Sequence, residues 1–224
     1  MSGGNPAPGT KPRPNYQLAL DRLLQEIPAG KKPRLLLHAC CAPCSSYVLE
    51  YLSSYFAITL YYYNPNISPQ EEYEKRVREV QRLLRELPEA GGVRFSEGPY
   101  DPERFAAIAR GLEDLPEGCE RCFRCYRLRL SQAAEAAKAG GFDYFCTTLS
   151  ISPYKNAQKL NTIGEELAAA YGVAWLPSDF KKRGGYQRSI ALSHTYGLYR
   201  QNYCGCIYSA TQARRKRGPN REEG

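Results

Sequence analysis

The sequence predicts an α/β fold, in which a mostly parallel sheet is covered by helices on both faces within a single domain. Two observations predict it. Short apolar or β-branched runs of the kind that form buried strands alternate along the chain with segments of ten or more residues that have helical spacing. Such alternation is typical of βαβ units, and 224 residues suffice for one domain, or two at most.

The elements of the first half are bounded by clear breakers. Residues 1–14 contain almost no apolar side chain, so we expect a disordered leader there. A helix is predicted over 16–27, because its leucines recur near helical spacing and a proline follows it. The run RLLLHA at 34–39 predicts a buried strand, and AITLYYY at 57–63 predicts a second one that ends at an Asn-Pro-Asn turn. The charged segment at 70–87 then predicts a long helix.

The second half continues the alternation. The expected elements are, in order, a weak strand at 93–96, helices at 102–110 and 122–139, a strand at 143–148, a helix at 156–171, a strand at 173–176 and a last helix at 187–194. The helix at 122–139 ends at two glycines, which are strong helix terminators. The order predicts a three-layer, Rossmann-like (HUP-like) domain over residues 15–210, followed by a basic tail at 211–224. In such folds ligands bind beyond the carboxyl ends of the strands.

Composition excludes several classes of protein. The longest apolar stretches fall far short of the roughly 18 residues that cross a bilayer, so we expect no membrane contact. The first residues do not have the pattern of a secretory signal, and we expect a reducing cytoplasmic setting. The net charge of +8 lies mostly in the two ends, including the basic run at 214–217, which suits phosphate backbones but also a solvated tail. Nine cysteines in such a setting favour metal ligation or redox chemistry over a disulfide framework.

The cysteines form three groups with different spacing. Cys40, Cys41 and Cys44 fall at the end of the first strand and the start of its helix, where backbone N–H groups stabilise thiolates. The CxxC pair and the CxC pair are Cys122 with Cys125 and Cys204 with Cys206. A CxxC pair can bind one metal or cluster, whereas a disulfide across one residue closes a small strained ring of the redox-active type.

Three interpretations compete for these groups. A structural zinc site would use two pairs of cysteines, but the adjacent Cys40 and Cys41 are awkward ligands for one small tetrahedral ion. A thioredoxin-like site rests on CAPC at 41–44 and leaves the later pairs unexplained. An iron–sulfur oxidoreductase accounts for all three groups, with cluster ligands in the first two and a dithiol electron carrier in the third.

Five motifs in one order resemble the epoxyqueuosine reductase QueH family. They are LLLHACCAPC at 35–44, YYYNPNISP at 61–69, CFRCYRLRL at 122–130, TTLSISPYKN at 147–156 and YRQNYCGCIYS at 199–209. The resemblance covers about residues 33–210. It implies the last step of queuosine synthesis, which is the two-electron reduction of the epoxide of epoxyqueuosine at the wobble position of tRNA with a GUN anticodon. It also implies an external electron donor, whose nature the sequence does not give.

The resemblance implies a site as well as a reaction. It places a [4Fe-4S] cluster on Cys40, Cys41, Cys122 and Cys125, and it makes Cys204 and Cys206 the redox-active pair. Members of the family look able to hold an additional mononuclear iron beside the cluster, and Cys44 is the candidate ligand for it. Two cysteines depart from the family pattern. Cys119 could compete for the cluster or be incidental, and Cys146 is expected to be a small buried residue.

The reaction also needs protons and a way to hold tRNA. The candidate proton donors are His38, Tyr154 and Lys155, although a structural, hydrogen-bonded role is favoured for His38. A metal with an open position could act as a Lewis acid on the epoxide oxygen. The candidate tRNA contacts are Lys181, Lys182, Arg183 and Arg188 around two glycines, together with Arg129, which should share a helix face with Cys122. Tyr186 and Tyr203 are candidates for stacking on an unpaired base.

The alternatives from other classes stay open at this point. One is a zinc-stabilised tRNA-binding module without catalysis, and another is a thioredoxin-like thiol reductase that acts on proteins. A third, an ATP-using tRNA thiolase, would need an SGGxDS-type phosphate loop after the first strand, where this chain has CCAPCSS instead.

Overall fold

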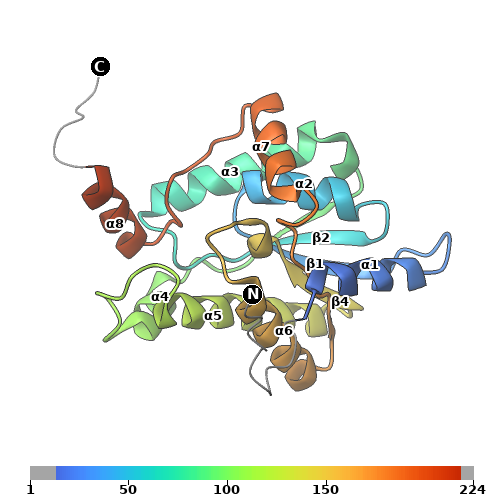
Figure 1. Cartoon of the computed structure of the whole chain (residues 1–224), viewed down its shortest axis with the longest axis horizontal. Helices are drawn as coiled ribbons and strands as arrows, with labels where there is room; N and C mark the ends of the chain where they lie inside the picture. Colours follow the sequence, from blue (N-terminus) through green and yellow to red (C-terminus); the bar gives the residue numbers. More distant parts are fainter. Residues whose placement is uncertain (1–13, 218–224) are drawn as a thin grey trace, which may run out of the picture.

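The protein is built on one five-stranded parallel sheet with the order β3-β2-β1-β4-β5 (Figure 1). The structure is a computed structural model that describes residues 14–217. Its strands are β1 (Arg34–Ala39), β2 (Ala57–Tyr62), β3 (Arg94–Glu97), β4 (Tyr144–Thr147) and β5 (Ala174–Trp175). Its helices are α1 (Tyr16–Glu26), α2 (Ala42–Leu52), α3 (Gln70–Glu86), α4 (Pro102–Ala109), α5 (Glu120–Ala139), α6 (Ala157–Tyr171), α7 (Gly185–Thr195) and α8 (Ile207–Arg217), with short 3-10 turns at Pro88–Ala90 and Thr148–Ile151. The α/β class predicted from the sequence is confirmed.

Helices cover the sheet on both faces, which gives the three layers. Figure 1 shows α2, α3 and α7 on one side of the sheet and α4, α5 and α6 on the other. The strand order changes direction at the centre, because the chain moves from β1 outward to β3 and then returns to place β4 on the other side of β1. In open α/β sheets such a reversal opens a crevice beyond the carboxyl ends of the two central strands. This crevice lies at the end of β1, directly ahead of Cys40.

The strand β1 is both the first strand in the sequence and the central strand of the sheet, and its position explains its apolar composition. Every residue of β1 after Arg34 is buried, as expected for a strand covered on both faces by helices. The buried core runs from this strand into both helical layers and includes Leu35, Leu37, Phe145 and Leu160. The site at the carboxyl end of β1 therefore stands on the most constrained part of the molecule.

Replacing Gly164 by Ala is expected to lower the free energy of unfolding by about 1–3 kcal/mol, the usual cost of overpacking a core. A Cβ at Gly164 in α6 would lie 2.2 Å from the Trp175 ring, which is held by a hydrogen bond to Asn161 and cannot move away freely. Urea unfolding measures the change. Gly92→Ala is the matched control, because a Cβ there meets open space. An unchanged midpoint for Gly164→Ala would contradict the packing described here.

The helix expected at 187–194, before the loop that holds Cys204 and Cys206, is present as α7. A helix after that loop was not expected. An additional helix, α8, begins directly after Cys206 and runs through the domain boundary set at residue 210. Its sequence has no apolar stripe, so hydrophobic periodicity could not reveal it. Almost all of the predicted leader at 1–14 and the last residues of the predicted tail, 218–224, lie outside the described residues. None of the described helices has the length and apolar character needed to cross a membrane.

Candidate active site

The first sulfur group, called the outer group here, consists of Cys40, Cys41 and Cys44. Their sulfur atoms all lie within 4.8 Å of one another, and those of Cys40 and Cys41 are 3.8 Å apart. The turn from β1 into α2 brings them together, because Cys40 follows the strand, Cys41 is the N-cap of the helix and Cys44 lies in its first turn. Thr148, at the end of the neighbouring strand β4, contacts the group through its hydroxyl, which is 3.4 Å from the sulfur of Cys40.

The outer group is arranged to hold one thiolate. Hydrogen bonds from the thiols of Cys40 and Cys44 lower the pKa of Cys41 well below its usual value, and the nearby charge of Arg76 acts in the same direction. The neighbouring Cys41 raises the pKa of Cys40 to about 12. A negatively charged sulfur with two sulfur neighbours at a helix N-terminus is a good ligand for a soft metal.

The second sulfur group, called the inner group here, brings together cysteines that are far apart in the sequence. It consists of Cys122 and Cys125 from the start of α5 and of Cys204 and Cys206 from the loop before α8, all of which line a small pocket of about 10 Å³, called the inner pocket here. Burial raises the pKa of Cys125 to about 12. The backbone N–H groups of Gly118 and Ser209 donate to the sulfurs of Cys122 and Cys206 at 3.3 and 3.4 Å.

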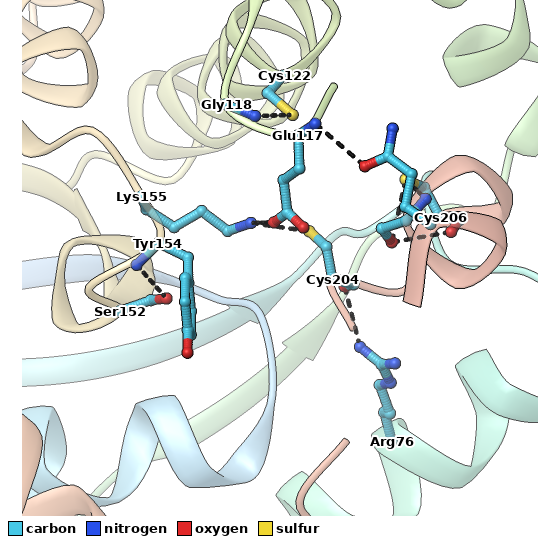
Figure 2. Close-up of polar contacts among 11 residues, drawn as sticks. Arg76, Glu117, Gly118, Cys122, Ser152, Tyr154, Lys155, Cys204 and Cys206 are labelled. Atoms are coloured by element: carbon cyan, nitrogen blue, oxygen red, sulfur yellow. Dashed lines mark hydrogen bonds and ion pairs between the residues drawn. The ribbon is translucent and has the colours of Figure 1, made fainter. Parts of the chain in front are cut away.

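A lysine is held against one sulfur of the inner group. Figure 2 shows the ammonium of Lys155 between the carboxylate of Glu117 and the sulfur of Cys204, to which it donates at 2.6 and 3.2 Å. Burial alone would lower the pKa of Lys155, but the Cys204 thiol and then Tyr126 and Glu117 raise it. Lys155 therefore stays protonated beside Cys204.

The loop that carries the CxC pair is held by hydrogen bonds to the carbonyl groups of Cys204 and Gly205. Arg76 on α3 donates to the carbonyl of Cys204 at 3.2 Å, as Figure 2 shows, and the N–H of Ser68 donates to the carbonyl of Gly205 at 3.0 Å. Gly205 has φ +117, a conformation that other residues rarely adopt. A Cβ there would also lie 2.9 Å from the Arg76 guanidinium. Glycine is therefore required between the two cysteines.

Both sulfur groups border one large cleft of about 940 Å³. The outer group and Cys204 line this cleft directly, whereas Cys122, Cys125 and Cys206 line only the inner pocket behind it. Cys204 thus belongs to the walls of both cavities. Three tyrosines, Tyr154, Tyr186 and Tyr203, also line the cleft.

The predicted cluster ligands are divided between the two sulfur groups. Cys40 and Cys41 lie in the outer group with Cys44, and Cys122 and Cys125 lie in the inner group. Within residues 14–217, the only set of three or more ligand atoms that all lie within 4.8 Å of one another is that of the outer group. Cys44 lies close to Cys40 and Cys41 because it is in the first turn of α2. The CxxC and CxC pairs, in contrast, lie together only because of the way the start of α5 and the loop before α8 pack.

The three candidate proton donors have very different environments. His38 is completely buried in β1, and burial followed by the charge of Arg129 lowers its pKa to about 3. Its ring is held between the Thr147 hydroxyl at 2.9 Å and the Tyr63 carbonyl at 3.0 Å, so it is a neutral structural residue away from the cleft. Lys155 and Tyr154 both line the cleft, and the Tyr154 side chain is 76% exposed. Of the three candidates, Tyr154 and Lys155 thus line the cleft, whereas His38 does not.

The candidate tRNA contacts do not gather in one place. Lys181, Arg183 and Arg188 form ion pairs with acidic neighbours, and neither they nor Lys182 are among the described residues that line the cleft. Arg129 is only 2% exposed and lies in the wall between the cleft and the inner pocket. An open phosphate contact at the protein surface is therefore incompatible with the position of Arg129.

The two additional cysteines have separate positions. Cys119 is the N-cap of α5 and belongs to neither sulfur group. Cys146 is fully buried in β4, as expected, and donates to the carbonyl of Leu176 at 3.3 Å. Sequence reasoning gave no role to Glu117, Arg76 or Thr148, although Thr148 lies within the motif at 147–156. Thr148 and Arg76 contact Cys40 and Cys204, and Glu117 holds the lysine that contacts Cys204.

Comparisons with known proteins show which family the chain belongs to. The family model described as epoxyqueuosine reductase QueH matches residues 35–212. Epoxyqueuosine reductase QueH of Streptococcus pyogenes is 43% identical over 204 residues, which are 88% of this chain and 80% of the relative. The protein of the same name from Thermotoga maritima is 37% identical over 188 residues, which are 81% of this chain and 93% of the relative.

A solved structure supports the fold independently. The U34-tRNA thiolase NcsA from Methanococcus maripaludis, determined with its [4Fe-4S] cluster, matches 91% of this chain and 75% of its own with a TM-score of 0.52. At 11% sequence identity this likeness concerns the fold alone. The family match, the similar full-length relatives and the sulfur-lined cleft lead to one conclusion: the chain belongs to the epoxyqueuosine reductase QueH family of oxidoreductases.

Proposed function

We propose that this protein reduces the epoxide of epoxyqueuosine at the wobble position of tRNA, giving the cyclopentene of queuosine and water. One observation carries the proposal beyond family membership. Two sulfur groups from three separate chain segments meet at the cleft and the inner pocket beside it, and Cys204 borders both cavities. Redox chemistry on a substrate in the cleft accounts for this concentration of thiols, which a binding role alone does not need.

The proposed cofactor is a [4Fe-4S] cluster. Cys40, Cys41, Cys122 and Cys125 would hold it, and Cys44 would be available to an additional iron. The donor set fits, because all of these ligands are thiols and the two cavities that they line share a wall. The thiolase of the same fold binds such a cluster. When bound, the cluster would supply electrons one at a time.

The CxC pair would supply both electrons of the reduction, while the cluster would carry electrons singly between the external donor and the pair. Removal of the epoxide oxygen as water consumes two electrons and two protons. Oxidation of the Cys204 and Cys206 thiols to a disulfide breaks two S–H bonds and forms one S–S bond. This oxidation releases two electrons and two protons, which balances the reduction. An external reductant then restores the two thiols.

Lys155 would act as the proton donor beside Cys204. Its ammonium already donates to the sulfur at 3.2 Å, so it holds a proton next to the sulfur that would react. Glu117 fixes the lysine in this position from the other side. Tyr154, which is exposed at the cleft, is the second candidate donor to the leaving oxygen.

The tRNA would place its wobble base in the cleft. Tyr154, Tyr186 and Tyr203 offer aromatic faces on which an unpaired base can stack. Lys181, Lys182, Arg183 and Arg188 remain the proposed contacts for more distant phosphates, at the cost of exchanging ion pairs within the protein for ion pairs with tRNA.

Iron and acid-labile sulfide analysis of protein purified without oxygen tests this function first. We expect about four of each per chain in the wild type and a loss of both in Cys122→Ser, because that substitution removes one thiolate ligand. Cys119→Ser is the matched control, since Cys119 lies three residues earlier and outside both sulfur groups. Zinc without sulfide in the wild type would contradict the proposal and favour the zinc-stabilised tRNA-binding module. Loss of the cluster in Cys119→Ser would contradict the ligand assignment.

A further inference from the structure

Three arginines of the described part of the chain are almost completely buried, and one of these three lacks a compensating partner there. Arg76, Arg121 and Arg129 are each 1–2% exposed. Arg76 is paired with the carboxylate of Glu72, and Arg121 donates to three backbone carbonyl groups. Arg129 has neither kind of partner among the described residues. A buried guanidinium is normally compensated by an anion or by several acceptors, so Arg129 requires an explanation.

The single contact of Arg129 fixes its position without neutralising it. Its Nη1 donates to the side-chain oxygen of Asn64 at 3.0 Å. Asn64 is itself held by a hydrogen bond of 2.8 Å to the carbonyl of Ala39, at the end of the central strand. The Nε and Nη2 groups of Arg129 have no acceptor within the described structure. Two nitrogen atoms of a rigidly held cation, with three N–H donors between them, are therefore left for a group outside the protein.

The surroundings of Arg129 identify the chemistry of that group. Arg129 lines both the cleft and the inner pocket, so it stands between the two sulfur groups. Arg129 shares the lining of the inner pocket with Cys125 and Cys204, and it shares the lining of the cleft with Cys40 and Cys204. The nearby His38 is neutral and held by other partners. An anion rich in sulfur is the acceptor that fits this position.

We propose that Arg129 is the counter-charge of the iron–sulfur cluster, positioned by Asn64 and donating its free N–H groups to the sulfur atoms around it. This inference rests on the proposed function, because it requires that the cluster is bound between the two groups. A cluster gains negative charge when it is reduced, and a fixed positive charge beside it favours the reduced state. Arg129 would thus raise the reduction potential of the cluster and make electron uptake from the external donor easier.

A second source of negative charge in the same place is the oxygen that leaves the epoxide. The two sources differ in when they are present, because the cluster is permanent and the oxygen arrives with tRNA. A measurement in the absence of tRNA therefore separates them. An effect of Arg129 on the resting protein can only come from the cluster.

The experiment is a dye-mediated redox titration of the anaerobic, cluster-loaded protein without tRNA, followed by the EPR signal of the reduced cluster. The variants are Arg129→Met, Arg129→Lys and the control Arg127→Met. Arg127 lies on the same helix but is about half exposed and is paired with Glu166. We expect a shift to more negative potential in Arg129→Met, a smaller shift in Arg129→Lys, which keeps the charge but not the fork of donors, and no shift in Arg127→Met.

The outcomes separate the inference from the function on which it rests. Equal potentials in the wild type and both Arg129 variants would overturn the inference, and they would do so even if turnover with tRNA fell. If Arg129→Met does not retain the cluster, the comparison of Arg129→Lys with the wild type decides the question in the same way. A wild-type protein without acid-labile sulfide would instead overturn the proposed cofactor itself, and the inference with it.

Discussion

Replacing Cys204 by Ser is expected to leave a folded, cluster-loaded protein that cannot convert epoxyqueuosine to queuosine over repeated cycles. A serine hydroxyl cannot form a disulfide with Cys206, so the pair can no longer give up two electrons. The fold should survive, because Ser is close in size to Cys and the carbonyl that Arg76 binds belongs to the backbone. Nucleoside analysis of tRNA after reaction, combined with iron and sulfide content, measures both parts of this expectation.

The same substitution distinguishes the alternative functions. A tRNA-binding module without catalysis would bind tRNA equally well before and after the change and would show no wild-type turnover. A thioredoxin-like reductase would keep its activity on protein disulfides, because its reactive pair would be Cys41 and Cys44. Cys146→Ala provides a control, since Cys146 is buried in β4 away from both cavities. Repeated turnover by Cys204→Ser at the wild-type rate would contradict the redox role of the pair.

Replacing Gly205 by Ala is expected to reduce turnover by about a hundredfold, the order of loss that follows when reacting groups move by roughly 1 Å. The new Cβ would clash with the Arg76 guanidinium and lie 3.0 Å from Ile67, in a backbone conformation that already disfavours any side chain. Because Arg76 is itself tied to Glu72, the CxC loop must shift instead. Steady-state turnover on epoxyqueuosine tRNA measures the loss.

Gly197→Ala is the matched control for this change. Gly197 also has a positive φ, but a Cβ there meets nothing within 4 Å. Its substitution therefore carries the conformational cost of alanine without the collision. A comparable loss of turnover in both variants would show that backbone strain alone, and not displacement of the two cysteines, is responsible.

The sequence was sufficient for the elements that depend on local pattern. The buried strand at 34–39 and the helix at 122–139 agree with β1 and α5 to within two residues, because burial and helix termination are encoded in adjacent residues. The position of the first cysteines at the carboxyl end of β1 follows from the same reasoning. The additional helix α8 was missed because it has no apolar periodicity.

The arrangement of the site could be predicted only in part. Spacing indicated that Cys122 and Cys125 act together, but their contact with the CxC pair depends on chain segments about eighty residues apart. Counting along α5 correctly placed Arg129 near the site, yet it could not reveal that this residue is buried and bound to Asn64. The burial of a side chain and its hydrogen-bond partner depend on how several elements pack together, so the sequence of one helix does not reveal them.

The position of Cys204 has a consequence for the order of events in time. Cys206 is buried, so Cys204 is the member of the pair that the cleft exposes. In the proposed reaction the tRNA base occupies the same cleft, and the reductant that reloads the pair must enter through it as well. Substrate and reductant would then share one entrance. The proposed reaction would therefore alternate between two states, in which the tRNA leaves the cleft before the reductant enters it.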